Sequence, residues 1–275
     1  MCELMGLSFA RPISADFSIR EFGVCGEENA DGWGLAWYPD HAVAVVKEPV
    51  RWGQTPYVSF LENYTGLRSS LYIAHVRHKT MGGEPTYADT HPFVRELNGR
   101  EYCFTHNGTL HGLNGQPPGR YRPVGRTDSE RAFCKLMEAI ACGHDPLAGE
   151  EDWRWLHGQL AALNDGGQLN CLLCDGDRLF CYHDWGGYKG LTFRRVRMPD
   201  LDTRRFEDAQ WTVDLGEEKS NEGYVIATRP LSRHGWRSFR PGELIVLEAG
   251  RIRFSSHGDP GQQGIAARAE ESSWH

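Results

Sequence analysis

The sequence has few cysteines and no long apolar run, and both absences narrow the class of protein. Eight cysteines are spread irregularly through 275 residues, which is too sparse for a disulfide scaffold and fits free thiols. The first 20 residues include charged side chains and no apolar signal-peptide core, and no stretch approaches the roughly 20 apolar residues of a membrane span. We therefore expect a soluble, cytoplasmic protein.

An excess of positive charge is also missing. The formal net charge of -7 gives no electrostatic footprint for nucleic acid or an anionic membrane, so we expect neither as a partner. A local run of arginines over residues 194–205 is diluted by nearby acidic residues, and we interpret it as a solvated face. The sequence contains neither a P-loop nor a Gly-x-Ser-x-Gly elbow.

What remains is the composition of a globular protein, with 40% hydrophobic and 24% charged residues. No internal repeat or clear linker divides the chain. We expect one domain over residues 1–254 and a polar, poorly ordered tail over residues 255–275.

Short strand-like runs outnumber helical patterns. Strands are expected over residues 2–9, 34–38, 42–46, 71–76, 102–105, 169–174, 178–183, 224–228 and 243–248. Helices are expected over residues 55–66, 129–142 and 152–163. Because the pattern lacks regular βαβ alternation, it predicts an α+β fold of layered sheets and helices.

The clearest helical pattern covers residues 129–142 and ends before Gly143. Thr127 and Glu130 have the spacing of a capping box at its start. The apolar residues that share one face are Phe133, Leu136, Met137 and Ile140. This pattern predicts a helix that packs one side on a sheet.

Cys2 is the first residue that offers chemistry. Removal of Met1, which a small second residue favours, would give Cys2 a free α-amine beside its thiol. Because an α-amine titrates near a pKa of about 8 and a thiol near about 8.5, the amine can take the thiol proton near neutral pH. The alternative is a structural cysteine in the core.

Other candidates follow predicted strands or open a predicted helix. Asn107 and Gly108 form either a hairpin turn or a pair of oxyanion donors, namely a side-chain amide and a backbone N–H. Arg77, which follows a strand, either faces solvent or binds a carboxylate through two hydrogen bonds. Asp128 either complements the helix dipole or pairs with an ammonium group. Together these residues suit an amino-acid substrate with a side-chain amide.

Short motifs carry these candidates in a definite order along the chain. They are Cys2, Ala74-His75-Val76-Arg77, Thr90-His91-Pro92-Phe93, His106-Asn107-Gly108 and Thr127-Asp128-Ser129-Glu130. The order resembles that of the class II glutamine amidotransferases, densely over residues 1–140 and more thinly to about residue 250. The segments Met1-Cys2-Glu3-Leu4-Met5-Gly6, Asp31-Gly32-Trp33-Gly34 and Arg122-Pro123-Val124-Gly125 are most similar to the standalone bacterial YafJ-like members.

The resemblance implies a four-layer αββα Ntn-hydrolase sandwich and hydrolysis of glutamine through a γ-glutamyl thioester on Cys2. Asn107 and Gly108 would form the oxyanion hole. Arg77 would bind the α-carboxylate of glutamine and Asp128 its α-ammonium group.

The resemblance also implies a substrate loop that includes Thr80 and Gly82. This sequence departs from many members just before the loop, where they carry Trp and it has His78. Released ammonia would pass to an acceptor, which a separate protein would have to bind because the chain has no synthase domain.

Histidines and a Cys-x-x-Cys pair raise a metal site as an alternative. The histidines of the first half include His75, His78, His91, His106 and His111. In a strand, residues three apart point to opposite faces, which separates His75 from His78 and Cys171 from Cys174. We therefore expect no metal and no cofactor.

Two other functions stay open at this point. The same nucleophile could hydrolyse a γ-glutamyl amide of a small metabolite without delivering ammonia. The chain could also be a binding subunit that catalyses nothing, which the presence of Cys2, Arg77, Asn107 and Asp128 disfavours.

Overall fold

The computed structural model describes residues 3–19, 30–50, 55, 57, 61, 64, 67–78, 86–113, 119–198, 205–207, 211–215 and 220–258. Residues 259–275, most of the predicted tail, lie outside this part of the chain. Of the predicted helix over residues 55–66, Tyr57 and Leu61 are described and are helical. No helix in the described part is long and apolar enough to cross a membrane.

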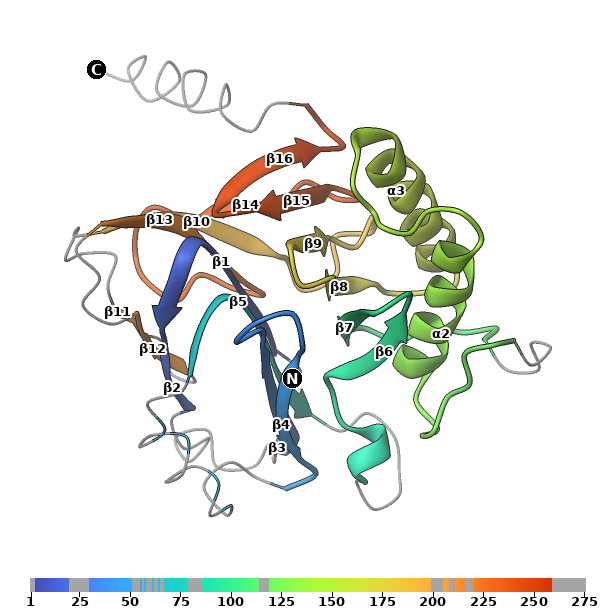
Figure 1. The fold of residues 1–275 in the computed structure, drawn as a ribbon, viewed down its shortest axis with the longest axis horizontal. Helices are drawn as coiled ribbons and strands as arrows, with labels where there is room; N and C mark the ends of the chain where they lie inside the picture. The colour runs from blue at the N-terminus through green and yellow to red at the C-terminus, as the bar shows by residue number, and fades with distance from the viewer. Residues whose placement is uncertain are drawn as a thin grey trace.

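Two large antiparallel sheets lie face to face (Figure 1). The first has the order β14 (Arg237–Ser238), β10 (Thr192–Met198), β13 (Asn221–Ala227), β1 (Glu3–Ser14), β5 (Arg68–His78), β3 (Ala30–Trp37) and β4 (Ala44–Glu48). The second has the order β16 (Arg251–Ser255), β15 (Leu244–Glu248), β9 (Arg178–Tyr182), β8 (Asn170–Cys174), β7 (Arg100–Asn107) and β6 (Phe93–Leu97). A small sheet joins β11 (Arg205–Glu207), β12 (Trp211–Asp214) and β2 (Asp16–Ile19).

Alternation along each strand divides the apolar side chains among three buried clusters. Leu4 of β1 lies in the cluster between the two sheets, whereas Met5 and Leu7 lie in the cluster on the outer face of the first sheet. Gly6 faces the second sheet so closely that a Cβ there would lie 2.9 Å from Leu179. Strand alternation therefore places the core on both faces of the first sheet.

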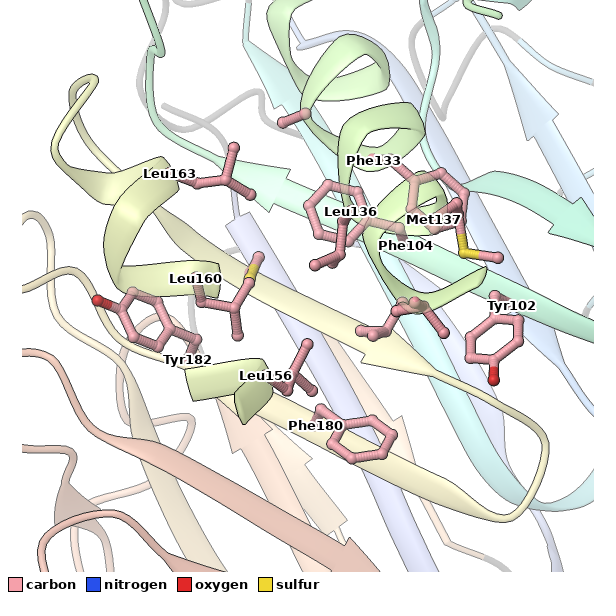
Figure 2. Close-up of a cluster of buried hydrophobic side chains, with 14 of the residues drawn as sticks. Tyr102, Phe104, Phe133, Leu136, Met137, Leu156, Leu160, Leu163, Phe180 and Tyr182 are labelled. Atoms are coloured by element: carbon pink, nitrogen blue, oxygen red, sulfur yellow. The ribbon is translucent and has the colours of Figure 1, made fainter. Parts of the chain in front are cut away.

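Helices α2 (Asp128–Ala141) and α3 (Glu150–Asn164) cover the outer face of the second sheet (Figures 1 and 2). Phe133 of α2 stacks on Phe104 of β7, with ring centroids 5.1 Å apart. Each such side chain contributes about 1.5–3 kcal/mol on burial. On the outer face of the first sheet, helical Leu61 joins the apolar cluster. The layers thus follow the predicted αββα order.

The capping box predicted at α2 is only half present. The Thr127 hydroxyl accepts a hydrogen bond from the Glu130 N–H, as predicted. The Glu130 carboxylate instead accepts from the backbone N–H groups of Val124 and Gly125 and pairs with Arg95 at 2.5 Å. The partners of Glu130 come from the turn before α2 and from strand β6. The spacing of Thr127 and Glu130 in the sequence therefore could not reveal these contacts.

All nine predicted strands are present, although β1 extends to Ser14, five residues beyond its predicted end, and β3 begins at Ala30, four residues before its predicted start. Several strands escaped prediction, among them β6, β10 and β16. In β10, part of the arginine run interpreted as a solvated face forms a strand near the edge of the first sheet, in which Val196 is buried. Arg195 and Arg197 are exposed, as the interpretation expects, but the sequence did not predict that the segment is a strand. Charged residues alternate there with buried ones, and the arginines outweigh the apolar signal.

Candidate active site

Two predicted site residues face the gap between the sheets at the ends of their strands. In β5, Arg77 lies four residues after Ile73, so strand alternation points both side chains to the same face, and Ile73 lies in the cluster between the sheets. In β7, Asn107 lies four residues after Cys103 and therefore points to the same face, where Cys103 belongs to the same cluster. The Asn107 side chain is buried. The start of β1 belongs to the same end of the first sheet, because Glu3 pairs with Val76 of β5.

Two hydrogen bonds connect Arg77 with the turn that precedes Asp128. The Arg77 guanidinium donates from Nη1 to the backbone oxygen of Asp89 at 3.1 Å. The Asp89 carboxylate accepts from the backbone N–H of Arg126 at 2.6 Å, and Asp128 lies just beyond that turn. Asp128 accepts from the N–H of Leu110 at 2.7 Å. The two charged candidates and the segment after Asn107-Gly108 are therefore held in one framework.

Asp89 links this framework as a charged group. It is buried, and it belongs to a short 3-10 turn over Tyr87–Asp89. Although burial acts in the opposite sense, hydrogen bonds from the backbone and side chain of Arg126 lower the pKa of Asp89. Its carboxylate is thus ionised at neutral pH and braces the turn that leads to α2.

Gly108 has a backbone that only glycine fits. Its φ is 155°, and a Cβ there would lie 2.0 Å from the backbone oxygen of Gln168. Beyond it, the chain forms an isolated bridge between Leu110 and Gly167, so Asn107-Gly108 is not a hairpin turn. The hairpin alternative is therefore wrong. Gly108 lies so close to the Gln168 backbone that there is no room for a side chain at position 108.

His106 fastens this segment to α2. Its Nε2 lies 2.9 Å from the Gln168 carbonyl oxygen, and its Nδ1 lies 2.9 Å from the Ser129 hydroxyl. Because a carbonyl only accepts, Nε2 carries the proton and Nδ1 accepts from Ser129. Burial lowers the pKa of His106, which favours this neutral tautomer. The histidine thereby fixes the segment that follows β7 relative to the first turn of α2.

A second buried histidine, His91, packs against His75 of β5. The His91 and His75 rings are 4.2 Å apart. Burial, followed by the proximity of His75, holds the pKa of His91 well below its usual range. The backbone around it is fixed by Lys47, which donates to the carbonyls of Thr90 at 2.6 Å and Pro92 at 3.0 Å. The neutral His91 imidazole therefore packs against His75 near Arg77.

The strand opposite Asn107 is braced from its other side. Asn107 pairs in register with Asn170 of β8, whose side chain donates to the backbone oxygen of Tyr188 and accepts from the N–H of Asp184. The Asp184 carboxylate accepts in turn from Leu169 N–H at 2.8 Å. Although burial opposes the effect, these backbone hydrogen bonds lower the pKa of Asp184. The end of β7 therefore rests on a fixed support.

The remaining predicted site residues are Cys2, Thr80 and Gly82, and all three lie outside the described residues. Glu3, next to Cys2 in the chain, is buried, and burial raises its pKa. Sequence reasoning missed Asp89 and Gln168. Asp89 stands two residues before the His91-Pro92 pair, and that proximity was the available signal. Gln168 acts through its backbone carbonyl, which leaves no signal in the sequence.

The described residues were also searched for metal sites. They contain no group of three or more His, Cys, Asp or Glu side chains that could hold a metal ion. Cys171 lies in the cluster under the helices and Cys174 in the cluster between the sheets, on opposite faces of β8 as predicted.

Comparison with known proteins identifies the relatives of this chain. The family model of class II glutamine amidotransferases matches residues 1–271. An uncharacterised protein of Methanocaldococcus jannaschii is 38% identical over 93% of this chain and 72% of its own length. YafJ of Escherichia coli, a candidate glutamine amidotransferase, is 31% identical over 88% of this chain and 96% of its own length.

Solved structures agree with this assignment. A Pseudomonas aeruginosa protein predicted to be a glutamine amidotransferase superposes with a TM-score of 0.73 at 30% identity, over 92% of this chain and all of that one. Glutamine phosphoribosylpyrophosphate amidotransferase of B. subtilis shares the fold at a TM-score of 0.60 and 16% identity, and this chain spans 49% of its length. The layers seen here are those of an Ntn-type sandwich, and the chain belongs to the class II glutamine amidotransferases.

Proposed function

We propose that this protein hydrolyses the side-chain amide of glutamine in the cytoplasm, through a γ-glutamyl thioester on Cys2, and releases glutamate and ammonia. The observation that carries the proposal is the hydrogen-bonded framework from Arg77 through Asp89 and Arg126 to Asp128 and Leu110. It links a cation and a carboxylate to Leu110, in the segment that follows Asn107-Gly108. A zwitterionic amino acid with a reactive side chain needs these groups around it.

Arg77 and Asp128 provide the charges that suit the two ends of glutamine. The Arg77 guanidinium can bind the α-carboxylate through paired hydrogen bonds. Each Asp128 oxygen accepts one backbone N–H, from Leu110 and from Ser129. Because a carboxylate has about four acceptor positions, acceptor capacity remains for the α-ammonium group.

In the proposed reaction, the α-amine of Cys2 takes the thiol proton, and the thiolate attacks the amide carbon of glutamine. The carbonyl oxygen becomes an oxyanion that accepts hydrogen bonds from the Asn107 side-chain amide and the Gly108 N–H. The protonated α-amine then gives its proton to the departing nitrogen, which leaves as ammonia. Water attacks the thioester, the amine accepts the water proton, and glutamate leaves with the thiol restored.

Cys2 can be tested directly by intact mass spectrometry after exposure to a diazo-ketone glutamine analogue. We expect one adduct on a chain that has lost Met1. Cys142→Ala is the matched control, because Cys142 is an exposed thiol at the end of α2 and its loss should leave the adduct in place. An adduct that persists in Cys2→Ala would contradict the proposed nucleophile.

The need for a free α-amine gives a second test. A chain with an uncleaved residue before Cys2 should release no glutamate from glutamine and keep its melting temperature. Normal glutamate release from that protein would contradict the role of the amine.

The clamp is tested by steady-state kinetics. Arg77→Lys and Asp128→Asn should raise KM for glutamine by about tenfold or more, with smaller effects on kcat. Unchanged KM in both variants would remove these two residues from the proposed substrate site. Ammonia release without an added acceptor, measured in the same assay, separates glutaminase activity from transfer to an acceptor on a partner protein.

A further inference from the structure

A cleft of about 1130 Å³ opens where the edges of the two sheets meet, far from the candidate active site. Its lining comes from β10, β13, β14, β16 and the start of α3. Gly250 at the cleft would meet the backbone of Phe9 and Ala10 in β1 if it had a Cβ. Because Glu3 starts the same strand, about 20 Å of strand separates the cleft from the candidate active site.

The cleft is rich in arginine, although the whole chain carries a formal net charge of -7. Its charged lining has six arginines and two glutamates. The arginines are Arg154, Arg194, Arg195, Arg237, Arg251 and Arg253, and the glutamates are Glu150 and Glu222. Positive charge in an acidic protein is thus concentrated in one hollow, where walls of low polarizability strengthen its field.

A tight turn holds the arginines of β16 against the first sheet. Ala249 and Gly250, between β15 and β16, have φ values of 47° and 69°. A Cβ on Gly250 would lie 2.4 Å from the backbone oxygen of Glu222 and 2.5 Å from the backbone nitrogen of Ala10. The turn is therefore packed on β13 and β1, and Arg251 leaves it beside Glu222.

Glu222 joins arginines from the two sheets. It accepts from Arg195 of β10 at 2.8 Å and from Arg251 of β16 at 3.1 Å. The side chains of Arg195 and Arg251 are 47% and 66% exposed, so both guanidinium groups can also reach a ligand in the cleft. The Glu222 carboxylate therefore positions the guanidinium groups of Arg195 and Arg251 in the absence of a ligand. It also occupies part of their hydrogen-bonding capacity.

From this arrangement we propose that the cleft binds a small molecule that carries two or more phosphate or carboxylate groups. Guanidinium forks match both groups through paired hydrogen bonds. The cleft volume of about 1130 Å³ is slightly above the usual range of ligand pockets, about 300–1,000 Å³. Arginines from several elements line one open cleft, whereas a nucleic acid needs an extended basic surface.

Calorimetric titration of the full chain with inorganic triphosphate at low salt tests the site. We expect saturable binding of one triphosphate per chain with Kd below about 1 mM, weakened about tenfold or more in Arg195→Ala/Arg251→Ala. Glu222→Gln should bind triphosphate more tightly, because it removes the competing carboxylate. Lys135→Ala/Arg120→Ala, which removes two exposed charges outside the cleft, should bind as the parent does.

The outcomes separate the alternatives. Citrate in place of triphosphate distinguishes carboxylate from phosphate ligands, and binding of either supports the site. The proposal fails if neither probe saturates, or if the double arginine variant loses no more affinity than the Lys135/Arg120 control. Tighter binding of an oligoglutamate peptide than of either probe, lost in the arginine variant, would mark a docking surface for an acidic protein and overturn the small-molecule proposal.

Discussion

Gly108→Ala should disrupt both the stability and the activity of the protein. A Cβ at this position would lie 2.0 Å from the Gln168 carbonyl oxygen and 2.7 Å from Nε2 of His106. The backbone of the segment must shift, because neither neighbour is the flexible end of a side chain. The shift strains three hydrogen bonds: His106 Nε2 to Gln168 at 2.9 Å, Gln168 N–H to Thr109 at 2.9 Å and His111 N–H to Gly166 at 2.8 Å.

The size of the effect can be worked out from these contacts. Alanine at a φ of 155° costs about 1–3 kcal/mol in backbone strain, and the loss of two of the three strained hydrogen bonds costs about 1 kcal/mol each. We expect a total loss of about 3–5 kcal/mol in the free energy of unfolding. Gly112→Ala is the matched control, because Gly112 has a φ of 74° but open space around it, and should cost about 1 kcal/mol.

Two assays compare the variants. The two variants should differ by about 2–4 kcal/mol, and thermal unfolding should separate their melting temperatures by about 4–16 °C, since each kcal/mol shifts the melting temperature by about 2–4 °C in a chain of this size class. Glutamate release should fall at least about a hundredfold in Gly108→Ala, because one oxyanion donor is displaced. Equal melting temperatures and equal activity in the two variants would refute the close-approach argument.

Other predictions concern the framework around the site. Asp89→Asn should raise KM for glutamine by about tenfold while kcat changes little, because the turn that carries Arg126 loses its charged acceptor; an unchanged KM would contradict this link. Glu130→Gln should cost about 2–4 kcal/mol in urea unfolding, since Arg95 loses its buried partner, whereas Glu150→Gln breaks an exposed pair and should cost under about 1 kcal/mol. The pKa of His106 is lowered from the ordinary value of 6.5, so the folded protein binds fewer protons than the unfolded chain, and stability should decrease as pH falls below 6.5 towards the lowered pKa. His106→Gln should reduce that slope in unfolding experiments between about pH 5 and 7, and an identical slope would count against it.

The sequence predicted most of the helices and strands in which the apolar residues recur with the period of that element. The apolar face of α2 and the strands around Gly6 and Ile73 follow from spacing alone, because alternation and helical repeat are local properties. The candidate residues Arg77, Asn107, Gly108 and Asp128 were found because they stand in short motifs with a definite order. Cys2, Thr80 and Gly82 remain predictions, since they lie outside the described residues.

By itself, then, the sequence determined the family through the order of its motifs, and the resemblance to that family implied the layer order and the chemistry that the site residues offer. Only the tertiary structure decided which groups hold those residues: the carbonyl of Gln168 against Gly108, and Asp89 between Arg77 and Arg126. The same holds for the arginine cleft, which composition presented as a diluted charged run. These contacts join residues that are far apart in the chain. Because tertiary packing selects each partner, the local sequence around either residue does not reveal the contact.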